Sequence, residues 1–219
     1  MKSQAKVHTG HEATGRLDAL GLREDQLHDA VEWAYRNHVA EVTEDEPPNS
    51  LGMTMYLKLT GRVRSVLKVL GWERDNGRNL CRTVHPAGIM SIVVAGGDHN
   101  TGREGERIPS PCTVSPKGKA AGDIVNSERL FDITEYPIAV KRANGANLYY
   151  LLVYVDKELR EVRSELSLAY AVGPRGFVNE WAERIMLRTI PFGDADAVGA
   201  DLPSKPEIDI DVRRRSAEG

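Results

Sequence analysis

The sequence lacks the features that would mark a membrane protein or a disulfide-rich secreted protein. No apolar run approaches the roughly 20 residues that a membrane-spanning helix needs, and residues 1–20 contain no apolar segment of the secretory type. Two cysteines, Cys81 and Cys112, do not make a disulfide framework. With 41% hydrophobic and 28% charged residues among 219, the composition predicts a globular cytoplasmic protein with no membrane partner.

Recurrent catalytic motifs are absent too. The chain has no Gly-x-Ser-x-Gly and no His-Glu-x-x-His sequence. Gly97 and Gly102 have the spacing that opens a phosphate-binding P-loop, but Arg103 and Glu104 stand where that loop needs Lys and Ser or Thr. A glutamate cannot supply the hydroxyl that holds magnesium, so the sequence argues against nucleotide hydrolysis at this loop.

Metal-binding patterns are equally sparse. Four side chains are chemically suited to zinc: Cys81, His85, His99 and Cys112. Their spacing contains neither paired pattern of structural zinc sites. Carboxylates and a lysine that a metal-dependent nuclease could use occur without a clean Asp…Glu-x-Lys arrangement, at Asp132, Glu135, Lys141, Asp156, Glu158 and Glu165. We therefore expect no metal and no cofactor, assign no catalytic residue, and leave enzymatic activity open, with a preference for none.

What the sequence does contain is one basic segment. Residues 54–85 carry 7 Lys or Arg against 2 Asp or Glu, whereas residues 1–53 carry 5 against 10 and residues 86–219 carry 17 against 20. A local excess of positive charge in a chain of net charge −3 indicates an anion-binding surface. Chance clustering of solvated charges is the alternative.

Periodicity predicts the order of elements around this segment. Apolar positions at helical spacing lie between residues 25 and 42, namely Leu27, Ala30, Val31, Ala34, His38 and Val39. The acidic, proline-containing stretch 43–50 breaks the helix, and residues 51–59 form a short one. A basic helix follows from Thr60, closed by Gly71. Asn76-Gly77 then predicts a tight hairpin turn.

This order of helix, break, short helix, basic helix and hairpin resembles the winged helix-turn-helix fold over residues 26–86. In that family the second helix lies in the DNA major groove and the wing contacts the backbone or minor groove. The residues that the resemblance places on DNA are Arg62, Arg64, Ser65 and Lys68 in the helix and Arg74, Arg78 and Arg82 in the wing. The two short helices are separated by only a residue or two, fewer than the roughly 3–4 that are usual, and one continuous helix over 51–70 is the alternative.

The second half predicts a different architecture. Buried or half-buried strands are expected at 88–97, 148–156 and 161–172, and helices at 123–133 and 177–186. In 161–172 the alternation places Arg163 and Glu165 on an outward face. The aromatic run at 148–154 is more typical of core than of a base-stacking platform. Lys117 and Lys119, before a helix, are candidates for binding an anion, and a solvated loop is the alternative.

We therefore predict an α+β protein. It comprises a mobile arm (1–22), a winged helix-turn-helix (23–86), a small α+β domain with antiparallel strands and a long Gly/Pro-rich loop at 98–122 (88–212), and a tail (213–219). The expected function is DNA binding in regulation, phage or plasmid replication, or defence, with a second domain that dimerises, senses a small molecule or holds a partner. The alternatives are a nucleic-acid-processing enzyme with loop 98–122 at its active site, and a protein-interaction winged helix.

Overall fold

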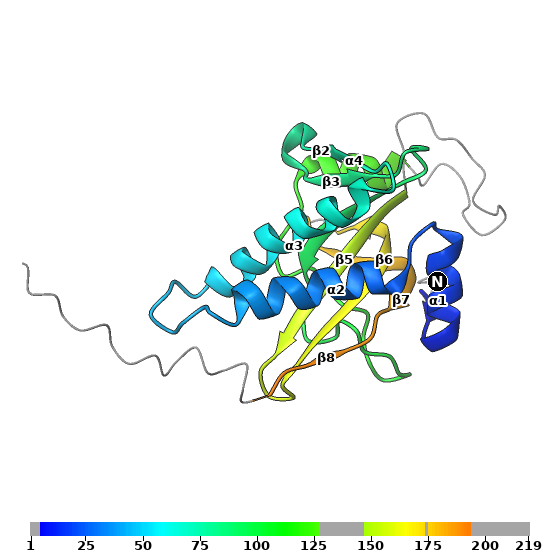
Figure 1. Ribbon diagram of the computed structural model, residues 1–219. Coiled ribbons are helices and arrows are strands. Elements are labelled where there is room, and N and C mark those ends of the chain that lie inside the picture. Colours follow the sequence, from blue (N-terminus) through cyan, green and yellow to red (C-terminus); the bar gives the residue numbers. More distant parts are fainter. Residues whose placement is uncertain (1–4, 128–146, 174, 194–219) are drawn as a thin grey trace, which may run out of the picture.

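The computed structural model describes residues 5–127, 147–173 and 175–193, which form an α+β fold around one mixed sheet (Figure 1). The strands are β1 (Lys6–His8), β2 (Glu73–Asp75), β3 (Arg82–Val84), β4 (Met90–Gly96), β5 (Asn147–Asp156), β6 (Glu161–Val172), β7 (Val178–Met186) and β8 (Ile190–Pro191). The helices are α1 (Gly10–Ala19), α2 (Glu24–Ala34), α3 (Ser50–Lys68) and α4 (Lys119–Ser127), with a π-helical turn at Tyr35–Val39 and a 3-10 turn at Gly77–Asn79.

The strand order across the sheet is β1-β7-β6-β5-β4-β3-β2, and β8 pairs with β6. Strands β5, β6 and β7 are antiparallel, whereas β4 runs parallel to β5, and β1 parallel to β7. A parallel pair needs a crossover connection, and α4 lies in the one between β4 and β5.

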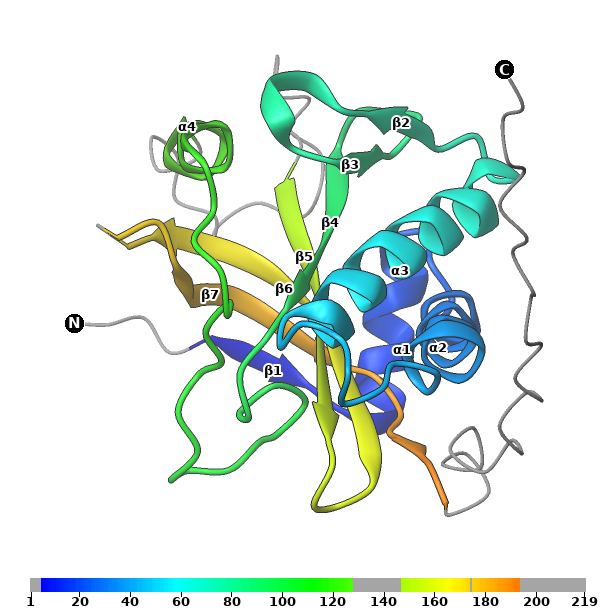
Figure 2. The same cartoon turned by 90° about the vertical axis from the view of Figure 1, so that its left-hand side faces the viewer.

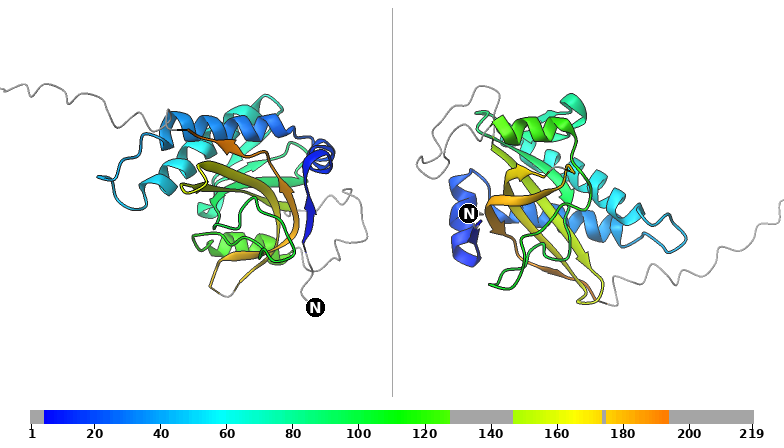
Figure 3. Two further views of the ribbon diagram at one scale, coloured as in Figure 1. Left: turned by 90° about the horizontal axis from the view of Figure 1, so that it is seen from below. Right: turned by 180° about the vertical axis from the view of Figure 1, so that it is seen from behind.

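Both faces of the sheet are covered (Figure 2). Helices α1, α2 and α3 pack on one face, where Ile92, Val94 and Leu151 point, whereas alternate residues such as Val93 and Leu152 point toward α4. Viewed from behind, α4 lies against the face opposite α2 and α3 (Figure 3). Burial on both sides explains why β4 and β5 are continuous apolar runs.

The segments predicted as separate domains share this sheet and its core. Apolar residues of α2 and α3 lie in one cluster with residues of β5 and β6, and β3 pairs with β4 across the expected boundary near residue 87. The expected arm, residues 1–22, contains β1 and α1, in which Ala13 and Leu17 are buried. An amphipathic helix must bury its apolar stripe against another layer, and here that layer is the sheet.

The two helices expected at 51–59 and from residue 60 form one helix, α3. Its buried residues Met55, Leu59, Val63 and Leu67 recur every four positions without interruption. A glycine inside a helix costs only about 1 kcal/mol relative to alanine, so Gly61 does not break a stripe that the sheet and α2 bury. The short interhelical turn of a helix-turn-helix does not form there.

The hairpin of β2 and β3 is present, but its turn is longer than the predicted two residues. Asn76 to Cys81 connect the strands through the 3-10 turn. The Asp75 carboxylate accepts a hydrogen bond of 2.6 Å from the Gly77 amide, and this side-chain bond satisfies the backbone locally in place of a tight strand turn.

The helix predicted at 177–186 is wrong, because this segment is strand β7. Register shifts between β6 and β7 include a change from the pair Ala171–Glu180 to the pair Val172–Val178, which leaves Asn179 as an extra residue on β7. Such an irregularity adds a residue to one strand. As a result Val178 and Trp181, three positions apart, lie in the same core cluster and imitate helical spacing.

The outward, solvent-facing placement predicted for Arg163 and Glu165 is also wrong, since both are buried on β6. The Arg184 guanidinium donates to both carboxylate oxygens of Glu165, at 2.9 and 2.5 Å. Glu165 also accepts the Gly102 amide at 2.8 Å, and Arg184 donates to the Arg103 carbonyl at 3.0 Å. A charge is tolerated inside a protein when it is paired and hydrogen-bonded, and loop residues supply the remaining partners.

Arg163 holds the same loop. Its guanidinium donates to the carbonyl oxygens of Thr101 and His99, both at 3.0 Å, and it lies 3.0 Å from the Asp156 carboxylate. Gly102 packs against it with a positive φ of 67°, and an added Cβ would lie 2.8 Å from the Arg163 Cβ. Loop 97–118 is therefore fastened to the sheet by two buried arginines.

A second polar cluster ties the N-terminal segment to the sheet. The Glu183 carboxylate accepts hydrogen bonds from Arg16 at 2.5 and 3.1 Å and from the Tyr149 hydroxyl at 2.8 Å, and it lies 3.0 Å from His8 Nε2. Burial alone would raise the pKa of Glu183. The hydrogen bond and charge of Arg16 outweigh it, so its pKa lies below the ordinary 4.5.

No helix in the described ranges is long and apolar enough to span a bilayer. The predicted helix beyond residue 127, the tail, and Asp132, Glu135 and Lys141 lie outside the described residues.

We expect Glu183→Gln to destabilise the fold by about 3 kcal/mol, the low end of the roughly 3–5 kcal/mol for breaking a buried pair, because Arg16 is partly exposed. A carboxyl group with a lowered folded-state pKa stabilises the fold above its unfolded value and loses that contribution as pH falls through the folded-state pKa. Denaturant unfolding from pH 7 to pH values below 4.5 should therefore show a shallower acid loss in Glu183→Gln than in the native chain. Glu180→Gln, an exposed change on the same strand, should behave like the native chain, and an equal acid loss in all three would contradict the assignment.

Candidate anion-binding site at the hairpin and the start of α4

Arg64, predicted to face DNA, instead joins α3 to the hairpin. Its Nη2 donates to the Asn76 side-chain oxygen at 2.7 Å and to the backbone oxygens of Asp75 and Arg82 at 3.3 and 3.2 Å. A guanidinium satisfies several carbonyl oxygens at once because it offers five donors. Arg64 therefore links the basic part of α3 to the hairpin.

Two other predicted contacts are engaged within the fold. The Arg62 guanidinium lies 5.1 Å from the centre of the Trp33 ring, within cation–π range. Arg82 pairs with Asp75, to which its Nε donates at 3.0 Å. The amide of Gly77, followed by Arg82, lowers the pKa of Asp75 and keeps this pair charged at neutral pH.

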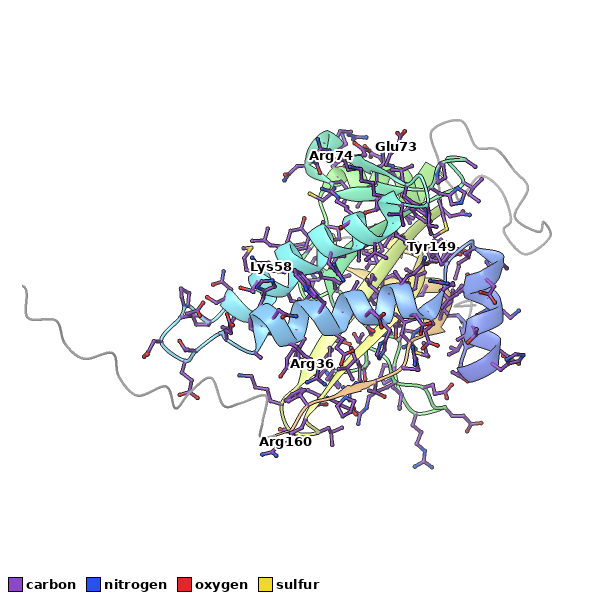
Figure 4. The ribbon with its side chains drawn as sticks, in the orientation of Figure 1. Arg36, Lys58, Glu73, Arg74, Tyr149 and Arg160 are labelled. Atoms are coloured by element: carbon purple, nitrogen blue, oxygen red, sulfur yellow. The ribbon has the colours of Figure 1, made fainter. Side chains whose placement is uncertain are left out.

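The remaining predicted contacts are exposed. Within the described part of the chain, the side chains of Ser65, Lys68 and Arg74 make no hydrogen bond or ion pair. Arg78 is exposed as well and pairs with Asp123 of α4 across the surface. Figure 4 shows Arg74 on the hairpin, at the opposite end of the molecule from Arg160. Free positive charge is therefore present at the hairpin end.

Next to these residues the edge of the sheet is open. Strand β3 pairs with β4 only at Ser91 and Ile92, and beyond that point a cavity of about 230 Å³ takes its place. Its lining comes from α3, the hairpin connection, β4 and the start of α4: Tyr56, Arg78, Asn79, Leu80, Cys81, Val93, Val94, Pro116, Lys117, Gly118, Ala120 and Ala121. The structure thus brings Arg78 and Lys117, predicted separately, to one site.

The electrostatics of the cavity favour an anion. Lys117 has no acidic partner among the described residues. Burial without such a partner lowers its pKa from the ordinary 10.5, and a bound anion would favour the charged form again. Burial and a hydrogen bond with Cys81 raise the pKa of Tyr56 to about 12, so its phenol stays neutral near pH 7. Lys119 is exposed at the first turn of α4 and does not line the cavity. A helix N-terminus with free amides adds to the attraction for negative charge.

The backbone around Arg78 is unusual. Arg78 and Asn79 have positive φ angles of 56° and 59°. Asparagine adopts this region readily, but an arginine there costs of order 1–3 kcal/mol. The strained turn places Arg78 at the cavity.

The loop with P-loop spacing does not form a phosphate cradle. Its amides are used inside the protein: Thr101 and Arg103 donate to the carbonyls of Asp98 and Asn100, and Gly102 donates to Glu165. A Cβ at Gly97 would lie 2.0 Å from the Thr101 hydroxyl, so this glycine serves close packing.

The residues considered for metal binding or hydrolysis are placed as follows. Among the described residues, three possible ligands come within 4.8 Å of one another only at His28, Asp29 and Glu32 on α2, and Glu32 pairs there with Arg36. The four residues weighed for zinc do not form such a group. Asp156 and Glu165 are bound by Arg163 and Arg184.

Comparisons with protein-family models, with curated proteins and with solved structures find no match to the chain. The candidate site is therefore assigned from the geometry of the cavity alone. Sequence reasoning missed the part that Tyr56 and Asp123 play in it, and neither residue carries a local signal of that role.

We expect Arg64→Met to loosen the hairpin without unfolding the protein, because three hydrogen bonds to the connection and to β3 are lost while the apolar stem stays. Hydrogen exchange of the amides in residues 73–84 should accelerate by about tenfold, the effect of roughly 1.4 kcal/mol of lost local stability. Lys68→Met, on the exposed side of the same helix, is the matched control. Equal protection in the two variants would show that Arg64 does not hold the hairpin.

Proposed function

We propose that this chain is a cytoplasmic nucleic-acid-binding protein that holds the phosphate backbone, most simply of DNA, at the end formed by the hairpin, the C-terminal half of α3 and the start of α4. The observation that carries the proposal is that Arg78 and Lys117 line one cavity. Lys68 on α3 and Arg74 on the hairpin add two exposed cations that make no hydrogen bond or ion pair among the described residues. Arginine and lysine on a single face are what phosphate contacts require.

The arrangement supports contact by the hairpin and helix end more than deep entry of α3 into a groove. Arg62 and Arg64, two of the four helix residues expected to face the major groove, are held by Trp33 and by the hairpin. Lys68 and Ser65 are the remaining helix residues free for contact. Binding dominated by phosphate contacts is salt-dependent and weakly selective for sequence.

The charge of the surrounding protein strengthens this reading. The chain is acidic overall, with a net charge of −3. A positive patch on an acidic protein orients that patch toward a polyanion. The winged-helix resemblance enters the proposal only through the hairpin and the helix that Arg64 joins to it.

The test is fluorescence anisotropy with a labelled duplex of about 20 base pairs, roughly two helical turns, across a salt series. The native chain should bind, and the Lys68→Ala, Arg74→Ala, Arg78→Ala variant should lose both affinity and about three units of the slope of log K against log salt, since each phosphate contact contributes about 0.9.

The matched control removes the same charge elsewhere. Lys6, Arg107 and Lys157 are exposed on β1, on loop 97–118 and at the β5–β6 turn, away from the hairpin. Their triple alanine variant should keep the native slope. An equal loss of affinity and salt slope in both triple variants would show that only the net charge of the protein matters. Absence of duplex binding by the folded native chain would refute the proposal. Metal-dependent cleavage of the duplex would favour a nucleic-acid-processing enzyme.

A further inference from the structure

A second cavity continues from the first along the open edge of β4. It measures about 200 Å³ and is bounded by the first turns of α3, the ends of β4 and β5, and loop 97–118. Its lining residues are Leu51, Gly52, Met55, Tyr56, Val94, Ala95, Gly96, Gly97, Val114, Val153, Tyr154 and Val155. Tyr56 and Val94 line both cavities, so the two adjoin at the strand edge, and together we call them the trough.

The two halves of this trough differ in chemistry. The half at Arg78 and Lys117 is cationic, whereas the half at Gly52 and Val114 is lined by apolar side chains and two tyrosines. Each half is smaller than the roughly 300–1,000 Å³ usual for small-molecule sites, but together they fall within that range. A ligand that fills the trough therefore has an anionic end and a compact apolar end.

We propose that the trough binds one nucleoside monophosphate unit, with its phosphate at Lys117 and Arg78 and its base in the apolar half beside Tyr56. This rests on the proposed function, because it names the unit of nucleic acid that the same site recognises. A base is flat and can stack its π-face on a tyrosine ring. Such stacking contributes to binding whichever base is present. The unit comes from a free nucleotide or from one nucleotide of a bound strand.

The glycines of α3 allow a steric test that does not disturb the fold. A Cβ added at Gly52 or at Gly61 would meet nothing within 4 Å, and neither glycine has a positive φ. Gly52 lines the apolar half, whereas Gly61 lines neither cavity. Gly52→Leu should thus fill the base half, and Gly61→Leu is its matched control on the same helix. Both replace a helix glycine by a better helix former, so neither should lower the melting temperature.

Calorimetric titrations of the full chain with AMP, adenosine and inorganic phosphate measure the two halves separately. AMP should bind at least about tenfold more tightly than either part alone, because one ligand then engages both halves. Gly52→Leu should reduce AMP affinity to that of phosphate, Lys117→Met should reduce it to that of adenosine, and Gly61→Leu should leave it unchanged.

AMP affinity that is unaffected by both Gly52→Leu and Lys117→Met overturns the inference, and so does the absence of AMP binding by the folded native chain. Tighter binding of decyl phosphate than of AMP would also overturn it, because the apolar half would then accept an alkyl chain instead of a base. Duplex binding is measured on the same preparations. Duplex binding without AMP binding refutes the trough alone, and AMP binding without duplex binding refutes the proposed function alone.

A competition experiment distinguishes a free nucleotide from one nucleotide of a bound strand. The competitor is a dA strand of about 12 nucleotides, a length that single-strand sites commonly cover. If this strand displaces bound labelled AMP at a lower concentration than unlabelled AMP does, the trough holds one nucleotide of a bound strand. If the strand fails to displace AMP, the trough binds free nucleotide. Both results support a nucleotide site and separate its two sources.

Discussion

The fold depends on the burial of the central strands β4 and β5 on both faces. Their side chains are apolar on either side, so each face needs a cover. Helices α1 to α3 supply one, and α4 with loop 97–118 supplies the other. A loop rich in backbone polar groups can lie against a sheet only if those groups are satisfied. Arg163 and Arg184 provide this by donating to loop carbonyls while they pair with acidic residues of the sheet.

The candidate site follows from a mismatch in strand length. Strand β3 covers only the start of β4, and the loop rejoins the edge where Val114 donates to the Gly96 carbonyl. Between these points the edge is not covered by a strand, and the trough fills the gap. The hairpin, α3 and α4 meet around it, which is why residues far apart in sequence line one cavity.

The basic residues predicted to contact DNA divide into two groups by what they contact among the described residues. Arg62, Arg64 and Arg82 are used within the protein, against a ring, a turn and an aspartate. Lys68 and Arg74 remain free, and Arg78 forms only an exposed pair with Asp123, an interaction typically worth about 1 kcal/mol or less. An exposed pair of this kind can be exchanged for a phosphate at little cost, whereas the internal contacts cannot.

Local apolar patterns in the sequence determined helix α2 and strands β4, β5 and β6, because each pattern reports contacts with a neighbouring layer along a single element. The hairpin was predicted from the Asn76-Gly77 pair, although its turn is longer than that pair indicates. The apolar pattern did not determine that α3 is continuous, since a stripe such as Leu59 and Val63 needs a sheet to bury it before it outweighs Gly61. It misassigned β7, because a strand irregularity produces helical spacing. Only the tertiary structure decided that Glu165 is buried and that Arg78 meets Lys117, since both depend on what lies across space from a residue and not on what precedes it in the chain.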